Sequence, residues 1–534
     1  MTERKLPIGV QSFEILRENN FLYIDKTRYV AQLLSGRVYF LSRPRRFGKS
    51  LFLSTLAAYF RGEKELFGGL YLAQAEEELA RQSKREAWQK HPVLYLDLNA
   101  KNFDTKQALI DTLERHLLNW EQEYNLVQRF DAPEDRFYDI IEQLYRSTGT
   151  RVVVLVDEYD KPLLQTLEKE QSELHETFRR ILAGFYSVLK SCDQYIQFVF
   201  LTGVTKFSKL SVFSGLNNLN DISLDNQYAG ICGITEEELR DNFLPEIEQL
   251  REELGYSEDA MFSKLRQLYD GYKFAIKGAN VYNPFNLLKV FQKLSLGYYW
   301  FATGTPTFLA KKLQELRYPL PDLDNNVALT RMDLENPHEF ADDPIQILYQ
   351  AGYLTIKTYN TEYDEFTLGF PNDEVRYSFW ELLLKCYFLR PATVRLSELS
   401  KFIEAVKHGD VDDFMTRMQS FIAGMSYPTT DEPNLIEWNY QMVFYLVFRL
   451  MGQHVHTEVH NIVGRADCVV ELKDTIYLFE FKLWSTGSPE DALAQREEKG
   501  YAVPYQSSGK KLIAVGASFD EAKRNIGAWK AKEL

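Results

Sequence analysis

The first two hundred residues contain continuous apolar runs that predict the buried strands of a parallel sheet. A strand covered on both faces is apolar throughout, whereas a half-exposed strand alternates between apolar and polar residues. Segment 38–60, VYFLSRPRRFGKSLFLSTLAAYF, has the pattern of such a strand followed by a basic loop and a helix. Further strands are predicted in HPVLYLDL (91–98), RVVVLVDEYD (151–160) and YIQFVFLTGVT (195–205). Strands that alternate with Leu-, Glu- and Gln-rich helices predict an α/β domain with its ligand chemistry at the carboxyl ends of the strands.

The pattern changes at about residue 235, where amphipathic helices and loops replace the buried strands. QILYQAGYLTIKTYN (346–360) predicts a helix followed by a hairpin, as in winged-helix modules, and YPTTDEPN (427–434) marks a boundary. Beyond it, the pattern predicts a helix (437–452), a run of strands, a helix (489–502) and a last strand (511–516). We therefore predict three domains, at 1–234, 235–430 and 431–534.

Composition supports a globular protein of several domains. The 534 residues exceed one core at roughly 100–200 residues per domain. Hydrophobic residues make up 45% and aromatic residues 14%, which excludes a disordered chain. The net charge of −14 weighs against nucleic acid as a partner, but binding depends on local patches. From Glu437 onward acids and bases nearly balance, so this class of partner stays open.

The cysteines and the apolar segments predict a cytoplasmic location. Cys192, Cys232, Cys386 and Cys468 lie far apart without a CxxC spacing, which fits a reducing compartment and argues against a disulfide framework or a zinc ribbon. The first residues, MTERKLPIGVQSFEIL, lack the apolar core of a signal peptide. No uninterrupted apolar run reaches about 18 residues, so we expect no membrane span.

A phosphate site is predicted where RPRRFGKS (43–50) joins a strand to a helix. Gly48 would let backbone amides approach an anion at the positive end of the helix. Lys49 would reach the β- and γ-phosphates, and the Ser50 hydroxyl would bind Mg²⁺. The first glycine of the full P-loop pattern is replaced by Arg43, so a basic helix cap on a solvated face is the alternative.

A second element strengthens the nucleotide hypothesis. Four valines and a leucine lead into Asp157 and Glu158, the pattern of a Walker B strand. Asp157 would hold Mg²⁺, directly or through water, and Glu158 would polarise the attacking water. Thr202 and Thr205, at the end of the next strand, are candidates for sensing the γ-phosphate. Hydroxyls that cap the strand are the structural alternative.

The segment GRADCVVELKDTIYLFEFKLW (464–484) predicts a hairpin that carries a metal site. Glu480 and Lys482 share one face of the second strand because side chains alternate. Asp467 and Glu480 would hold Mg²⁺, a cation that prefers oxygen ligands, and Lys482 would orient the attacking water and stabilise charge on a phosphate. An ordinary surface ion pair is the alternative.

Several neighbouring residues are candidates for supporting roles. Glu437 could add a carboxylate, Gln495 could position water or backbone, and Arg465 could contact phosphate. A zinc site is an alternative interpretation of four further residues. We judge it weaker than the interpretation that they are solvent-facing positions of a strand, because no residues that would orient the zinc ligands can be recognised. Its ligands would be His454, His456, His460 and Glu458.

These residues and their surroundings resemble the bacterial AAA-ATPase-like family that carries a C-terminal PD-(D/E)XK nuclease domain. The resemblance covers nearly the whole chain. It includes LPIGVQSFEILRENNFLYIDKT (6–27), RPRRFGKS, VVVLVDEYDKPL (152–163), LTGVTKFSKLSVFSGLNNL (201–219), YDGYKF (269–274), YNPFNLL (282–288), ATGTPTFL (302–309), YQAGYLTIK (349–357), GRADCVV and FEFKL. It implies an α/β protein with a P-loop NTPase parallel sheet, a helical and winged-helix-like middle region, and a restriction-endonuclease-like C-terminal α/β domain.

The resemblance also assigns roles. It implies that Arg43 is the family's own residue, that Asp467, Glu480 and Lys482 form the nuclease triad, and that Glu437 and Gln495 are accessory. Asn439 lies close to where an acid is expected, so the position of Glu437 is less firmly assigned.

The functional expectation is an ATP- and Mg²⁺-dependent enzyme. ATP held by Gly48, Lys49 and Ser50, with Arg45 and Arg46 neutralising charge, would gate cleavage of nucleic acid, DNA before RNA, in a bacterial defence role. The alternative is a nucleotide-dependent binding switch whose nuclease fold does not cut. A hexameric remodelling ring is weaker, because no arginine finger can be identified. Whether the chain forms a homo-oligomer stays open.

Overall fold

A computed structural model describes residues 5–99, 102–167, 171–206, 218–301, 307–324, 327–335, 344–388, 399–424, 433–452, 468–499 and 502–534. The chain divides into two compact units. The first combines Met1–Gly304 with Asn325–Glu374, and the second combines Thr305–Asp324 with Val375–Leu534. The predicted division into three domains is finer than these two units and stays a prediction.

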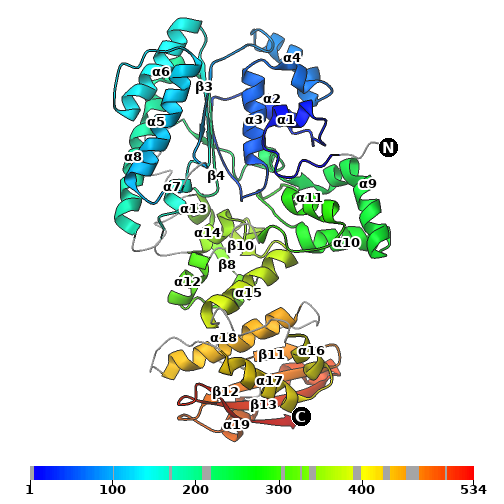
Figure 1. Cartoon of the computed structure of the whole chain (residues 1–534). Helices are drawn as coiled ribbons and strands as arrows, with labels where there is room; N and C mark the ends of the chain where they lie inside the picture. Colours follow the sequence, from blue (N-terminus) through cyan, green and yellow to red (C-terminus); the bar gives the residue numbers. More distant parts are fainter. Residues whose placement is uncertain are drawn as a thin grey trace. The chain divides into compact units, whose positions relative to one another are not determined.

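The first unit is built on a five-stranded parallel sheet (Figure 1). Its order is β2-β3-β4-β1-β5, so β4 lies between the strand that precedes the basic loop and the strand that ends in Asp157. The four predicted strands are confirmed, and a short fifth strand adds to the edge. Their bounds are β1 Val38–Ser42, β2 Val93–Asp97, β3 Val152–Asp157, β4 Ile196–Gly203 and β5 Asn220–Asp221.

Helices cover both faces of this sheet (Figure 1). Val199 and Leu201 of β4 belong to the core formed with α5, α6 and α8, whereas Phe198 and Phe200 contact aromatic rings of α3 on the other face. This alternation explains the continuous apolar sequence of the strand. The helices are α1 Phe13–Glu18, α2 Thr27–Leu33, α3 Lys49–Phe60, α4 Tyr71–Gln82, α5 Lys106–Glu123, α6 Pro133–Thr148, α7 Lys161–Leu164 and α8 Ser172–Ser191.

The rest of the first unit contains a helical cluster and a small antiparallel sheet. The cluster comprises α9 Glu236–Leu254, α10 Glu258–Tyr269 and α11 Pro284–Lys293, with the short pair β6 Ile234–Thr235 and β7 Val281–Tyr282. Thr235 caps α9 in a capping box with Glu238. The predicted helix and hairpin are confirmed as α14 Pro344–Gln350, β9 Thr355–Asn360 and β10 Glu365–Gly369. A third strand, β8 Val327–Thr330, pairs with β10, and α13 Arg331–Glu335 follows β8 in the sequence.

The second unit contains a four-stranded mixed sheet, ordered β11-β12-β13-β14, in which only the central pair is parallel. The hairpin predicted within 464–484 is confirmed, because β11 and β12 pair antiparallel. The prediction of a last strand at 511–516 is wrong, because that strand continues to Asp520 and β14 follows it. The strands are β11 Cys468–Glu471, β12 Thr475–Leu483, β13 Lys511–Asp520 and β14 Asn525–Glu533.

Helices pack on both faces of this second sheet as well. Phe414 of α17 and Phe444 and Phe448 of α18 contact the rings of Phe479 and Phe481 in β12. The second unit's helices are α12 Thr307–Glu315, α15 Asp373–Phe388, α16 Leu399–Lys407, α17 Val411–Ala423, α18 Pro433–Met451 and α19 Pro489–Lys499. Short 3-10 turns lie at Lys64–Phe67, Asp193–Tyr195, Asn226–Tyr228, Leu320–Leu323 and Val503–Ser508. Among the described helices, none has the length and apolar character needed to cross a bilayer.

Candidate nucleotide and nuclease sites

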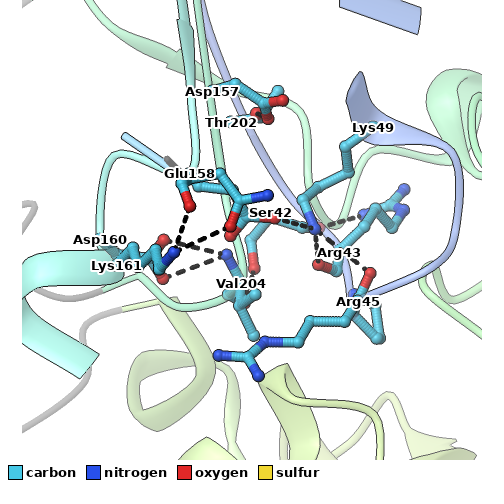
Figure 2. A network of polar contacts seen from close by, with 12 residues as sticks. Ser42, Arg43, Arg45, Lys49, Asp157, Glu158, Asp160, Lys161, Thr202 and Val204 are labelled. Atoms are coloured by element: carbon cyan, nitrogen blue, oxygen red, sulfur yellow. Dashed lines mark hydrogen bonds and ion pairs between the residues drawn. The ribbon is translucent and has the colours of Figure 1, made fainter. Parts of the chain in front are cut away.

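The loop between β1 and α3 is folded around the side chain of Lys49. Gly48 precedes α3 at φ 99°, a left-handed conformation that favours glycine. The Lys49 Nζ donates hydrogen bonds to the carbonyls of Arg43, at 3.1 Å, and Pro44, at 3.3 Å (Figure 2). It also lies 3.3 Å from Glu158 Oε1. The ammonium is therefore buried but neutralised, at the N-terminus of a helix that favours anions.

Arg43, which replaces the first glycine of the pattern, is a structural anchor. Its side chain is buried, and its guanidinium donates to the carbonyls of Ser42, Ser223 and Tyr228. It also lies 4.3 Å from the ring centre of Phe274. These contacts bind the loop to the segment after β5. Arg43 therefore makes the loop rigid through the hydrogen bonds of its side chain.

The end of β3 brings the two predicted magnesium ligands together. Asp157 is 3% exposed and accepts a hydrogen bond from the Thr202 hydroxyl at 2.7 Å, and the Ser50 hydroxyl lies close enough to stabilise its charged form. Burial, reinforced by the neighbouring Glu158 carboxylate, raises the pKa of Asp157, while the two hydroxyls and Lys49 oppose that shift. Two oxygen donors at a buried position beside a lysine fit a hard divalent cation next to phosphate.

Glu158 and Asp160 follow in a tight turn. Glu158 has φ 53°, an uncommon value for a residue with a side chain, and its carboxylate faces Lys49. Asp160 is fully buried and accepts from the amides of Val204 and Thr205 and from the Thr205 hydroxyl at 2.6 Å (Figure 2). Burial raises the pKa of Asp160 to about 6. The hydroxyls of Thr202 and Thr205 thus donate to the carboxylates of Asp157 and Asp160, and their proposed role in sensing the γ-phosphate stays a prediction.

Three of these groups, Lys49, Ser50 and Glu158, line a cavity of about 480 Å³. Small-molecule sites have volumes of roughly 300–1,000 Å³. Arg45, Arg46, Lys49, Ser50 and Glu158 all line it. Apolar side chains also line it, namely Leu22, Ile24, Ile231, Ile234, Phe243, Phe285 and Leu288. A lining that combines charged and apolar side chains fits a molecule that carries phosphates and a flat hydrophobic base.

Lys161 and Asn99 are among the polar residues of this cavity that were not predicted from the sequence. Lys161 lines it, and its Nζ donates to the carbonyl and the side-chain oxygen of Asn99, the latter at 3.0 Å. Burial lowers the pKa of Lys161. The only sequence signal was its place four residues after Asp157, close to the end of the strand.

In the second unit, Glu480 and Lys482 lie on one face of β12. Glu480 is 3% exposed and Lys482 is half-buried. Leu478, on the same face, packs in a cluster with Leu512, whereas Phe481 contacts α18 on the opposite face. This is the alternation that the sequence predicts. A buried carboxylate beside a lysine is costly without a neutralising partner and suits an oxygen-ligated cation.

Helix α19 covers the face that carries Glu480. Gly516 pairs with Glu480 across β12 and β13, so a side chain there would point to the same face. A Cβ at Gly516 would lie 2.3 Å from the carbonyl oxygen of Pro489, which begins α19. Gln495 lies on this helix and is half-buried. The helix that carries the predicted accessory residue therefore packs directly over the site.

The remaining predicted residues are only partly described. Asp467, Arg465, the three histidines and Glu458 lie outside the described residues, and Glu437 belongs to α18 without a described side chain. Cys468, which follows Asp467 in the sequence, pairs with Phe479, which precedes Glu480. Within the described part of the chain, no three His, Cys, Asp or Glu side chains form a metal-binding group.

Comparisons with known proteins identify a family for each of two parts of the chain. A family model for a predicted AAA-ATPase matches residues 7–213, and one for the PD-(D/E)XK nuclease superfamily matches residues 435–529. An uncharacterized protein in the 5′ region of vnfD from Azotobacter chroococcum mcd 1 is 36% identical over 542 residues, and the match covers 100% of both chains. This chain belongs to the AAA-ATPase-like family with a C-terminal PD-(D/E)XK nuclease domain.

A solved structure also resembles this AAA-ATPase-like protein. It is the ORC1 protein of Aeropyrum pernix in complex with DNA, which is 10% identical and has a TM-score of 0.25. The match covers 67% of this chain and 91% of that chain. At this score the resemblance supports no argument about function. The AAA-ATPase-like and nuclease-like assignments therefore depend on the family models and the full-length relative.

Proposed function

We propose that this protein binds and hydrolyses Mg·ATP at the first unit's cavity and cleaves nucleic acid, DNA in preference to RNA, with the second unit. The nucleotide state controls cleavage. One observation supports the proposal most strongly: Ser50 and Asp157 meet beside Lys49, at a helix N-terminus that borders a cavity. A basic helix cap on a solvated face would not be buried there with a carboxylate and a hydroxyl.

Each residue of the nucleotide site has a distinct proposed role. The amides at the start of α3 bind phosphate oxygens, and Lys49 exchanges its carbonyl and carboxylate partners for the β- and γ-phosphates. Ser50 and Asp157 hold Mg²⁺, which neutralises charge developing on the phosphates. Glu158, released from Lys49, orients the attacking water. Arg45 and Arg46 border the same cavity and add positive charge.

The proposed cleavage site requires Asp467, Glu480 and Lys482. Glu480 and Asp467 hold Mg²⁺, and Lys482 orients water and stabilises charge on the scissile phosphate. Gln495 positions water or backbone from α19, and Glu437 adds a carboxylate. ATP-controlled cleavage of nucleic acid suits a role in bacterial defence, because an unregulated nuclease would damage the host.

A second candidate function is a nucleotide-dependent binding switch that does not cut. The net charge of −14 favours it, because a strongly acidic chain repels nucleic acid. The buried Glu480 beside Lys482 favours cleavage, because a binding module has no need to bury this costly pair.

Plasmid nicking by the full chain with Mg²⁺ or Mn²⁺, with and without ATP, tests the proposal. We expect Glu480→Ala and Lys482→Ala to abolish nicking while ATP binding persists, and Lys49→Ala to abolish ATP binding. The matched controls are Lys511→Ala and Lys64→Ala, which remove exposed lysines from surface ion pairs in the respective units. Nicking that persists in both nuclease variants would refute the cleavage assignment. Failure to bind Mg²⁺ or Mn²⁺ at Asp467 and Glu480, measured by calorimetric titration, would favour the switch.

A further inference from the structure

The loop RPRRFGKS (43–50), called the nucleotide loop below, is contacted by residues of the first unit that lie beyond residue 268 in the sequence. The Trp300 indole nitrogen donates to the carbonyl of Arg45 at 2.9 Å. The ring of Phe47 meets the ring of Tyr272 edge-on at 4.8 Å, and Tyr272 in turn contacts Trp300. One hydrogen bond and one aromatic contact therefore fix two residues of RPRRFGKS, Arg45 and Phe47.

Trp300 is itself fixed by a buried carboxylate. Glu374 is fully buried and accepts from the amide of Trp300 at 2.8 Å, from the amide of Phe301 at 3.4 Å and from the side-chain amide of Asn286. Burial raises the pKa of Glu374 to about 7. A buried carboxylate with three donors specifies one backbone position, because losing any donor leaves a costly polar group.

The segment YDGYKF (269–274) completes this arrangement. A Cβ at Gly271, which has φ 93°, would lie 2.2 Å from the carbonyl oxygen of Pro371. The side-chain amide of Asn372 donates to the Asp270 carbonyl at 2.8 Å. The residues just before Glu374 are therefore bound to the same segment that presents Tyr272 to the nucleotide loop.

Glu374 is also the last residue of the first unit. Helix α15 begins at Asp373 and runs to Phe388, and from Val375 onward it belongs to the second unit. A shift of the Arg45 carbonyl on nucleotide binding would act on Trp300, and through its backbone on the first turn of α15. The connection has only two steps, each of them a hydrogen bond between buried or half-buried groups.

We propose that Trp300 and Glu374 are a positioning pair that couples the conformation of the nucleotide loop to the start of α15, and thereby to the unit that contains the nuclease domain. The inference deepens the proposed function and rests on it. Neither residue contacts the nucleotide in this scheme. Trp300 follows the position of the loop through its hydrogen bond to the Arg45 carbonyl. Glu374 links the backbone of Trp300 to the first turn of α15.

Hydrogen exchange of backbone amides in the full chain, with and without saturating Mg·ATP, tests the coupling. We expect ATP to slow exchange in peptides that cover both 43–50 and 373–388. In Trp300→Phe, which keeps a ring but loses the indole donor, we expect ATP affinity to fall about 2- to 10-fold. Protection at 43–50 should persist at saturation, and the response at 373–388 should disappear. Glu374→Gln should behave like Trp300→Phe.

Trp88→Phe is the matched control, because Trp88 is buried in the same unit and its indole nitrogen has no acceptor among the described residues. It should respond as the parent protein does. A response at 373–388 that persists in Trp300→Phe, or that is missing from the parent protein although ATP binds, overturns the coupling and leaves the proposed function intact. Failure of the parent protein to bind ATP, or unchanged binding in Lys49→Ala, overturns both.

Discussion

Lys49 and Glu158 neutralise each other across 3.3 Å in the nucleotide site. Each group is thereby held close to where the proposed reaction requires it, one for phosphate and one for water. The pair must separate when phosphates arrive, because Lys49 cannot serve both partners. The positive φ of Glu158 shows that the backbone is constrained at this position, as often occurs at functional sites.

We therefore predict that Glu158→Gln binds ATP at least as tightly as the parent protein but hydrolyses it slowly. The amide cannot accept a proton from water, so kcat should fall by about 10²- to 10⁴-fold. Steady-state ATPase kinetics and calorimetric titration measure the two quantities. Glu77→Gln, at the exposed ion pair with Lys64, is the control. An unchanged kcat would remove Glu158 from the reaction.

The raised pKa of Glu374 predicts a pH-dependent stability difference. The carboxyl has an ordinary pKa of 4.5 and one of about 7 in the folded chain, so the folded state keeps its proton longer than the unfolded state. Stability from this group is therefore full below pH 4.5 and is lost as pH rises to about 7. Relative to Glu374→Gln, the parent protein should lose up to about 3 kcal/mol over this range. Urea unfolding at pH 5 and pH 8 measures the difference, and a gain by the parent protein would contradict it.

Sequence patterns could identify residues whose functional neighbours are close in the sequence. They could not identify residues whose partners are far away in the sequence. Gly48, Lys49 and Ser50 were found because strand, loop and helix are contiguous. The anchoring role of Arg43 could not be predicted, because two of its three carbonyl acceptors lie about 180 residues further along the chain. Trp300 was missed for the same reason, as its link to Arg45 spans 255 positions.

At the scale of elements, burial on both faces decided what could be predicted. β3 is buried throughout and was found from its apolar run. β14 was missed because, within this edge strand, Ile526 alone is buried, and Lys530, Lys532 and Glu533 are exposed and charged. The short strands β5 and β8 gain their pairing from neighbours and carry almost no periodic signal.

The contact between α19 and β13 yields a prediction about one glycine. In Gly516→Ala, the new methyl group would meet the Pro489 carbonyl, so α19 must move away from the face that carries Glu480. We expect a loss of about 1–3 kcal/mol in the second unit and weaker nicking, with ATP binding unchanged. Gly184→Ala in α8 is the control, because a Cβ there would meet no atom within 4 Å. Equal nicking by both variants would contradict the proposed site.

At the scale of the whole molecule, two compact units predict two separable thermal transitions. Mg·ATP at about 100 times its dissociation constant should stabilise the unit that binds it by about 2.7 kcal/mol. Differential scanning calorimetry should show one transition rising with ATP, and Lys49→Ala should abolish that rise. If ATP raised neither transition in the parent protein, the cavity of the first unit would not be the nucleotide site.

The chain passes between the two units three times, after Gly304, after Asp324 and after Glu374. The excursion ends in Asp324, whose carboxylate pairs with Arg376 at 3.2 Å and also with Arg449. A fragment that begins at Val375, or at the expected domain boundary of 431, would lack Asp324, so Arg449 would lose this ion-pair partner. Consequently, a single recombination point cannot transplant the C-terminal half onto another protein. The C-terminal half must be inherited together with Thr305–Asp324, which belongs to the same unit but is encoded upstream of it.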